Sequence, residues 1–247
     1  MTDKNLLAWS NKFLVNTYNN YDLFPAEKRI LSKLNLKNKK ILDVGIGTGR
    51  TTNYLIKLST KYMGIDYSPE MIKSAKKKFP KTDLRVKDIR KIKYKNKFDF
   101  IFFSYNGIDY LKNKERHRAF LKLYASLKKN GYFLYSFHNY DGYNPKKPLF
   151  QNNSKNIFLK IKSFFRYIIC TYNYNKLKKE ENDFHNYGYF IDGGGYFNLI
   201  TQYTKIKSEY SFLKKYFIVT FFNINGKKIN PKEKQTDWMI YVLCKKR

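Results

Sequence analysis

The chain reads ILDVGIGTGR over residues 41–50, a short apolar run that leads into three alternating glycines. The apolar run predicts a buried strand, and residues 51–58 predict a helix. Glycines in such a turn let the backbone approach a ligand closely, and the start of the helix offers unpaired N–H groups. Asp66 lies 21 residues after Gly45, at the end of the next predicted strand, where a carboxylate accepts hydrogen bonds from ribose hydroxyls. The stretch therefore predicts a site for a nucleoside-bearing cofactor.

Departures from other ligand-binding turns narrow the choice of cofactor. A dinucleotide fingerprint has a third glycine where this chain has Arg50, and the Gly-Lys-Ser/Thr of a P-loop is absent. Asp43, shortly before the first glycine, would repel a pyrophosphate and suits an ammonium group instead. S-adenosylmethionine carries a ribose, an ammonium group and a cationic sulfonium without any phosphate, so it matches these residues.

Strand and helix patterns alternate over the middle of the chain, which predicts a parallel, doubly wound α/β sheet. The pattern stops after His138 and resumes near Lys205. Helical patterns precede it at residues 6–18 and from Pro25 to Leu34. The predicted strands are 41–44, 62–66, 84–86, 98–103, 132–137, 217–222 and 238–244. The predicted helices between them are 51–58, 69–79, 113–127 and 205–215, and a hairpin turn is predicted at 224–227.

Composition and charge limit the function classes. The 247 residues carry 50 basic and 19 acidic side chains, a net charge of +31, which suggests nucleic acid or an anionic surface as a partner. Lysine, asparagine, isoleucine, tyrosine and phenylalanine make up 132 residues, an enrichment that an AT-rich genome also produces. The basic excess is strongest over residues 73–97, away from the expected substrate region. A solvated lysine-rich surface is therefore favoured over a nucleic-acid footprint.

The chain is expected to form one domain over residues 1–247, with an N-terminal helical cap at 1–37 and a substrate-recognition insertion at 139–203. No apolar run is long enough to span a membrane, and the N-terminus shows no secretory signal. Two cysteines indicate neither a disulfide framework nor a zinc site, which favours the cytoplasm. Within the insertion, residues 157–169 form an amphipathic helix, read either as a lid packed on the core, which is favoured, or as an interfacial membrane anchor.

Four segments together resemble the class I S-adenosylmethionine-dependent methyltransferases: residues 41–49, GIDYSPEM at 64–71, Asp88-Ile89, and FDFI at 98–101. The resemblance implies a Rossmann-like, seven-stranded, mostly parallel sheet with helices on both faces and an antiparallel last strand, plus a lid insertion. It implies that the glycines surround the methionine part of the cofactor S-adenosylmethionine. Methyl transfer would convert this cofactor to S-adenosylhomocysteine. The implied cofactor-binding residues are Tyr21, Asp43, Gly45, Gly47, Gly49, Asp66, Tyr67, Met71, Asp88, Ile89 and Ser104.

The later part of the chain looks like methyltransferases of bacterial surface-polysaccharide gene clusters. The matching residues are SFHN at 136–139 and DGGGYF at 192–197. This likeness implies methyl transfer to oxygen or nitrogen of a small polar metabolite or saccharide precursor. The candidate substrate-binding residues are Asn106, Tyr110, Asn139, Tyr187 and Tyr189.

The candidate catalytic residues are His138, Tyr105 and His185. His138 is the first candidate base because it ends a sheet strand, where α/β sites form, although a structural role is the alternative. Asp109 either lines the substrate site or caps the next helix. The histidine spacing predicts no metal site.

Two other functions stay open. An RNA methyltransferase is not favoured, because SYNG at 104–107 stands where an Asn-Pro-Pro-Tyr-type motif would follow the fourth strand. A catalytically silent cofactor-binding protein is the other alternative. The sequence does not indicate the oligomeric state.

Overall fold

A computed structural model describes most of the chain. The described residues are 4–10, 15, 22–111, 113–142, 156–158, 160–161, 163–165, 167–169, 171–172, 189–192 and 199–247.

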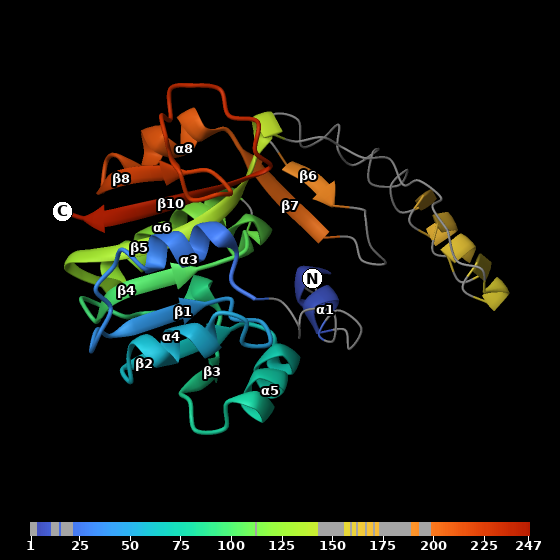
Figure 1. Ribbon diagram of the computed structural model, residues 1–247, viewed down its shortest axis with the longest axis horizontal. Coiled ribbons are helices and arrows are strands. Elements are labelled where there is room, and N and C mark those ends of the chain that lie inside the picture. The colour runs from blue at the N-terminus through green and yellow to red at the C-terminus, as the bar shows by residue number, and fades with distance from the viewer. Residues whose placement is uncertain are drawn as a thin grey trace.

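The centre of the molecule is a mostly parallel sheet with the strand order β3-β2-β1-β4-β5-β10-β8-β9 (Figure 1). β1 to β5 run parallel, whereas β10 is antiparallel to both of its neighbours, so the expected antiparallel last strand is confirmed. The bounds are β1 Ile41–Val44, β2 Tyr62–Asp66, β3 Leu84–Val86, β4 Phe98–Phe103, β5 Leu127–Asn139, β8 Phe217–Phe222, β9 Lys228–Ile229 and β10 Met239–Lys246.

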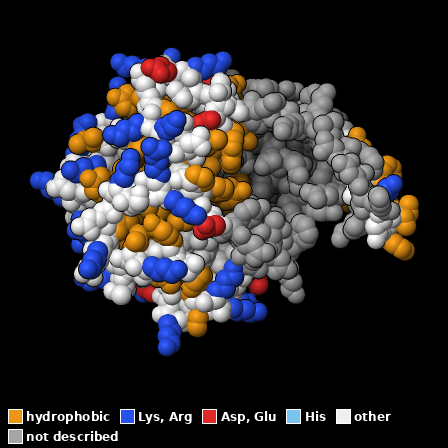
Figure 2. Space-filling model, viewed as in Figure 1, with side chains coloured by type: hydrophobic (Ala, Val, Ile, Leu, Met, Phe, Trp, Pro, Cys, Tyr) orange, Lys and Arg blue, Asp and Glu red, His pale blue; other side chains and the backbone are white. Residues whose placement is uncertain are grey.

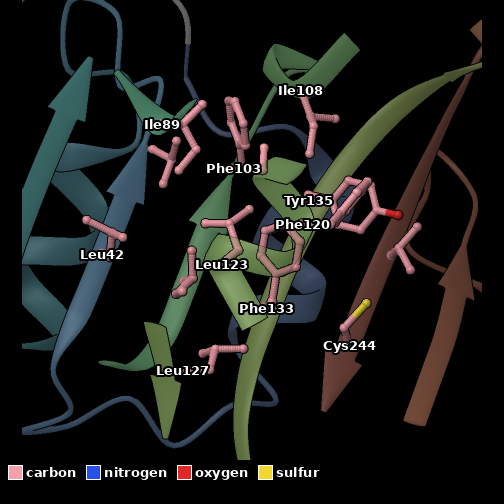
Figure 3. Packing of buried hydrophobic residues seen from close by; sticks show 14 of the residues in the cluster. Leu42, Ile89, Phe103, Ile108, Phe120, Leu123, Leu127, Phe133, Tyr135 and Cys244 are labelled. Carbon is pink, nitrogen blue, oxygen red and sulfur yellow. The ribbon is translucent and has the colours of Figure 1, made fainter. Parts of the chain in front are cut away.

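Helices cover both faces of this sheet. Because successive strand residues point to opposite faces, Ile41 and Phe100 enter one apolar cluster while Leu42 and Ile101 enter the other. α6 and α8 pack on the second cluster, as Figure 3 shows for α6, and α3, α4 and α5 pack on the first. The helices are α1 Lys4–Trp9, α3 Pro25–Leu31, α4 Thr52–Leu58, α5 Pro69–Lys78, α6 Asn113–Ser126 and α8 Ile206–Leu213. Short 3-10 turns are η2 Ile89–Lys91, η3 Gly107–Tyr110 and η4 Tyr140–Gly142.

Part of the expected insertion joins the sheet. β7 (Leu199–Thr204) runs parallel to the end of β5, with His138 opposite Tyr203, and β6 (Tyr189–Asp192) pairs antiparallel with β7. The sequence pattern did not predict either strand. It predicted the fifth strand over 132–137, whereas β5 begins five residues earlier, at Leu127, and ends two residues later, at Asn139. Pairing of His138 with β10 and β7, and of Asn139 with β7, explains the later end of β5. At its start, Leu127 pairs with Phe98 of β4.

The amphipathic helix expected at residues 157–169 departs from expectation. Its described helical residues lie between 157 and 172, and with the preceding Asn156 this segment is called helix 156–172. Its described apolar side chains are exposed, from 41% at Ile169 to 78% at Phe158, so the expectation that this face packs on the core is wrong. Figure 1 shows the helix at the far right, apart from the sheet. Among the described residues, no helix is long and apolar enough to cross a membrane.

Candidate functional site

A pocket lies where β1 to β4 end. The carboxyl ends of neighbouring parallel strands meet at one edge of the sheet, and ligands of doubly wound sheets bind at this edge. Ten of the predicted site residues line the pocket: Gly45, Gly47, Asp66, Tyr67, Met71, Asp88, Ile89, Ser104, Tyr105 and Tyr110. The sequence analysis did not assign these further lining residues: Trp9, Val44, Ile46, Thr48, Arg50, Thr51, Lys87, Arg90, Phe103, Gly107 and Leu111.

The glycine turn has the backbone shape that the sequence predicted. Gly45 has φ +64° and a Cβ there would stand 2.9 Å from the Phe103 ring, so a larger residue would collide with the end of β4. Gly47 has φ +56° and lines the pocket. Gly49 has φ +93° and does not line the pocket. Because it has no side chain, the ring of Phe79 packs closely against it. The turn therefore needs glycine for its close approaches as well as for its backbone angles.

Asp66 connects the glycine turn to the second strand. One carboxylate oxygen accepts the N–H of Gly47 at 2.9 Å, and the other accepts the N–H of Ser68 at 2.9 Å. Burial raises the pKa of Asp66 from 3.8 to about 6, against the lowering effect of these backbone donors. Each carboxylate oxygen can accept a second hydrogen bond, so Asp66 retains acceptor capacity toward the pocket.

Asp43 lies beneath the turn and does not line the described pocket. Its Oδ2 accepts hydrogen bonds from the hydroxyls of Thr51 at 2.6 Å and Tyr62 at 2.8 Å. Burial raises the pKa of Asp43 to about 7, despite those hydrogen bonds. Asp43 thus supports the start of α4 in this structure, and its direct contact with a cofactor stays a prediction.

Charged side chains also line the end of the pocket that follows β3. Asp88 accepts the backbone N–H of Arg90 at 2.8 Å and pairs with the guanidinium of Arg90 at 2.8 Å. Ile89, Met71 and Leu111 supply apolar wall nearby in the same pocket. An apolar slot with a carboxylate at its edge suits a flat heterocycle that carries an amino group.

A buried ion pair fastens α3 to the glycine turn, and sequence reasoning missed it. Both oxygens of Glu27 accept from Arg50, at 2.7 and 2.8 Å, and the Ser104 hydroxyl hydrogen-bonds to both side chains. Glu27 also accepts the N–H of Phe24 at 2.9 Å and so closes the start of α3. The only local signal was a glutamate in the first turn after Pro25, because the partner lies 23 residues away.

α1 covers the pocket from outside. The Trp9 ring lies 5.1 Å from the Tyr110 ring, centroid to centroid, and both line the pocket. Asn5 donates to the Tyr110 carbonyl at 3.1 Å, and the Ser68 hydroxyl donates to the Trp9 carbonyl at 3.1 Å. These bonds connect α1 to η3 and to the start of α5.

His138 is held by Asp109 at the end of β5. The Asp109 carboxylate accepts the backbone N–H of His138 at 2.6 Å and lies 3.0 Å from its Nδ1. If Nδ1 carries the proton toward this carboxylate, Nε2 is left as the acceptor. His138 does not line the described pocket, but Asp109 belongs to η3, whose Gly107 and Tyr110 do. The Asp109 carboxylate therefore orients the histidine.

A buried arginine lies behind this pair. Arg116 donates to both oxygens of Glu209, at 2.8 and 2.7 Å, and its Nη2 is 3.6 Å from Asp109. Burial alone would lower the pKa of Arg116, but the charge of Glu209 raises it above its ordinary value. Burial raises the pKa of Asp109, against the lowering effects of His138 and Arg116. The sequence showed no pattern for this cluster, because its members come from η3, β5, α6 and α8.

Buried polar atoms without partners occur just after β4, at Asn106, which does not line the described pocket, and within β7. Within the described residues, both side-chain amide atoms of Asn106 lack a hydrogen bond, as do Oγ1 of Thr201 and Oε1 of Gln202. Tyr105 and Asn106 both have positive φ, at +51° and +57°, a conformation that costs non-glycine residues about 1–2 kcal/mol each. Buried polar groups are normally satisfied, and strained backbone concentrates at functional sites, so this edge is suited to a polar ligand.

The remaining predicted residues do not meet at the pocket. The Asn139 side-chain amide donates to the carbonyls of Gln235 at 2.8 Å and Asp237 at 2.9 Å, so it ties β5 to the segment before β10 instead of facing a substrate. Tyr21, His185 and Tyr187 lie outside the described residues, as does the side chain of Tyr189. No cluster of metal-ligating side chains occurs in the part of the chain that the structure describes.

Comparisons with known proteins agree with this geometry. Residues 41–131 match the model of a family described as a methyltransferase domain. The protein named "Putative methyltransferase 235L", from Invertebrate iridescent virus 6, is 33% identical over 93 residues, which are 36% of this chain and 35% of that protein. The matched segment thus spans about a third of the length of this curated relative.

Solved structures share the fold over nearly the whole chain. An S-adenosylmethionine-dependent methyltransferase from Clostridium acetobutylicum has a TM-score of 0.61 at 18% identity, with 98% of both chains covered. The PH0226 protein from Pyrococcus horikoshii has a TM-score of 0.61 at 17% identity, with 90% of this chain and 88% of that chain covered. At such identities the likeness shows the fold.

Proposed function

We propose, from the class I S-adenosylmethionine-dependent methyltransferase domain that this chain carries, that the protein transfers a methyl group to oxygen or nitrogen of a small polar metabolite or saccharide precursor. Surface-polysaccharide biosynthesis is the setting in which we expect this acceptor. The observation that carries the proposal is the oriented His138, held by Asp109 beside the turn whose other residues line the cofactor pocket.

The pocket residues fit S-adenosylmethionine. The glycine turn has room for a ligand at Gly47, where the nearest atom to an added Cβ is 3.9 Å away. Asp66 retains acceptor capacity for ribose hydroxyls, and the stretch between Gly45 and Gly49 carries no lysine or arginine that would bind a phosphate. When bound, the cofactor supplies an electrophilic methyl group on its sulfonium.

Each wall of the pocket has a proposed task. Gly45 and Gly47 hold the methionine part, and Asp66 holds the ribose. Tyr67 and Met71 flank the adenine, with Asp88 and Ile89 at its edge. Ser104 supports this wall indirectly, because its hydroxyl is bound to Glu27 and Arg50.

His138 is the proposed general base for an acceptor hydroxyl or amine. Asp109 keeps its Nδ1 occupied, which leaves Nε2 to receive the proton as the acceptor attacks. A general base contributes about 10²- to 10⁴-fold to the rate, and orienting the two reactants contributes up to about 7–11 kcal/mol.

The test uses purified protein, methyl-labelled S-adenosylmethionine and an extract separated into RNA, protein, glycan and small-molecule fractions. Label in the small-molecule or glycan fraction, present with the wild type and strongly reduced with Asp66→Ala at a limiting concentration of the cofactor, supports the proposal. Label in RNA overturns it in favour of an RNA methyltransferase. Cofactor binding without label in any fraction overturns it in favour of a silent cofactor-binding protein.

A further inference from the structure

The helix at residues 156–172 presents an apolar face to the outside. Ile157 is 61% exposed, Phe158 78% and Phe165 60%, and Figure 2 shows orange side chains along this helix at the right of the molecule. Asn156 begins the helix: its side-chain oxygen accepts the N–H of Phe158 at 2.9 Å, and its carbonyl accepts the N–H of Lys160 at 3.1 Å. The exposed face therefore belongs to a helix with a defined start.

The apolar residues form one continuous stripe. At 3.6 residues per turn they fall within an arc of about 140°. Lys160, which is exposed, lies at one border of this arc. The exposed members of the stripe are Ile157, Phe158, Ile161, Phe164, Phe165, Ile168, Ile169 and Tyr172.

The longer segment that contains this helix carries charges of a single sign. From Gly142 through Lys179 the sequence contains nine lysines and arginines and no aspartate or glutamate. The whole chain has a net charge of +31. A core-facing lid would bury its stripe, and two copies joined by this face would bring like charges together. An anionic lipid surface instead accepts the apolar stripe among its acyl chains and the basic side chains among its phosphates.

We propose that helix 156–172 binds the surface of anionic lipid membranes, with its apolar stripe inserted and its basic side chains at the headgroups. Phe158 and Phe165 supply aromatic surface to the inserted face. The exposed Lys160 lies at its border, where a lysine buries its apolar stem while the ammonium group stays in water. The proposal concerns attachment to a membrane surface and does not depend on the methyl-transfer reaction.

The experiment is flotation of the full chain with vesicles of phosphatidylcholine alone or mixed with phosphatidylglycerol. We expect binding to the anionic vesicles that weakens as salt is raised. Joint replacement of the two phenylalanines, Phe158→Ser and Phe165→Ser, weakens binding about 10- to 100-fold, because two large apolar groups no longer leave water. Lys160→Gln weakens it about fivefold, the effect of one basic group near a charged surface.

Matched controls separate this helix from diffuse attraction. Ile218→Ser removes an apolar side chain that is 57% exposed on β8, and Lys57→Gln removes an exposed charge on α4; both leave binding nearly unchanged. Unaltered affinity for S-adenosylhomocysteine shows that each variant is folded. The proposal is overturned if no vesicle binds, or if the phenylalanine pair and the controls weaken binding equally. A concentration-dependent dimer that the phenylalanine pair abolishes, without vesicle binding, overturns it in favour of an interface between copies.

Discussion

Replacing Asp66 by asparagine tests the cofactor site and its electrostatics together. The asparagine side chain keeps the shape of the aspartate but lacks the negative charge that ribose hydroxyls bind. Loss of charge-assisted hydrogen bonds costs about 1.5–3 kcal/mol, so we expect affinity for S-adenosylhomocysteine at pH 8 to fall about 10- to 150-fold. Removing the whole group, Asp66→Ala, is expected to weaken binding within the same range.

The pH dependence of binding provides a second readout of Asp66. With a pKa of about 6, the fraction of ionised carboxylate rises roughly tenfold between pH 5 and pH 7. Wild-type affinity therefore rises about tenfold over this interval, whereas the asparagine variant shows a much smaller change. Isothermal titration calorimetry measures both, with Asp83→Asn, a partly exposed carboxylate paired with Arg85, as the control.

The stability of the apo protein changes in the opposite direction. Because burial raises the pKa of Asp66 from 3.8 to about 6, the folded state holds this proton more tightly than the unfolded state. The bound proton therefore adds to the free energy of unfolding. This added stability is complete below pH 3.8 and is lost as the pH rises through about 6. Between pH 4 and pH 7 the wild type should lose about 2 kcal/mol of unfolding free energy relative to the asparagine variant. Equal affinities and parallel stability curves for the two proteins would refute the assignment of Asp66.

Three further predictions concern other parts of the site. His138→Asn is expected to lower kcat about 10²- to 10⁴-fold with little change in cofactor affinity. Asp109→Asn is expected to lower kcat as well, again without altering cofactor affinity. A loss confined to cofactor binding would contradict the role of His138 as base and of Asp109 as the residue that orients it. Glu27→Ala leaves the Arg50 charge buried and unpaired, so urea denaturation should show a loss of about 3–5 kcal/mol, and a loss under about 1 kcal/mol would contradict the buried pair. Trp9→Ala uncovers the pocket and should weaken S-adenosylhomocysteine binding about tenfold by calorimetry, whereas an unchanged affinity means that α1 does not cover the ligand.

Local patterns predicted most strands of the central sheet with close bounds. Five strands, β1, β2, β3, β4 and β8, begin and end at the predicted residues. Their apolar runs are short, and charged residues, glycine, serine or asparagine lie at or close to most of their ends, so the local sequence indicates where each strand begins and ends. The glycine turn and Asp66 could be predicted for a similar reason. They follow β1 and end β2, two adjacent strands joined by one short connection, which brings them to the same edge of the sheet.

The sequence pattern of helix 156–172 was read correctly as amphipathic, but the location of its apolar face was not. A stripe that packs on a core and a stripe that faces outward have the same period. Only the exposure of the side chains in the folded structure distinguishes them. The strands β6 and β7 were missed for a related reason, since β7 pairs with the end of β5, far away along the chain.

By itself, the sequence determined the α/β class, the edge of the sheet at which ligands bind and the glycine turn with Asp66, because these follow from periodicity and from contacts between neighbours in the chain. The other expected cofactor-binding residues came from the resemblance to the class I methyltransferases. The tertiary structure alone decided which charges meet in the interior. Glu27 pairs with Arg50, and Arg116 joins Glu209 to Asp109, across separations of 23 and 93 residues for the hydrogen-bonded pairs. No local pattern encodes such pairs, because burial makes an unpaired charge costly wherever its partner lies in the chain.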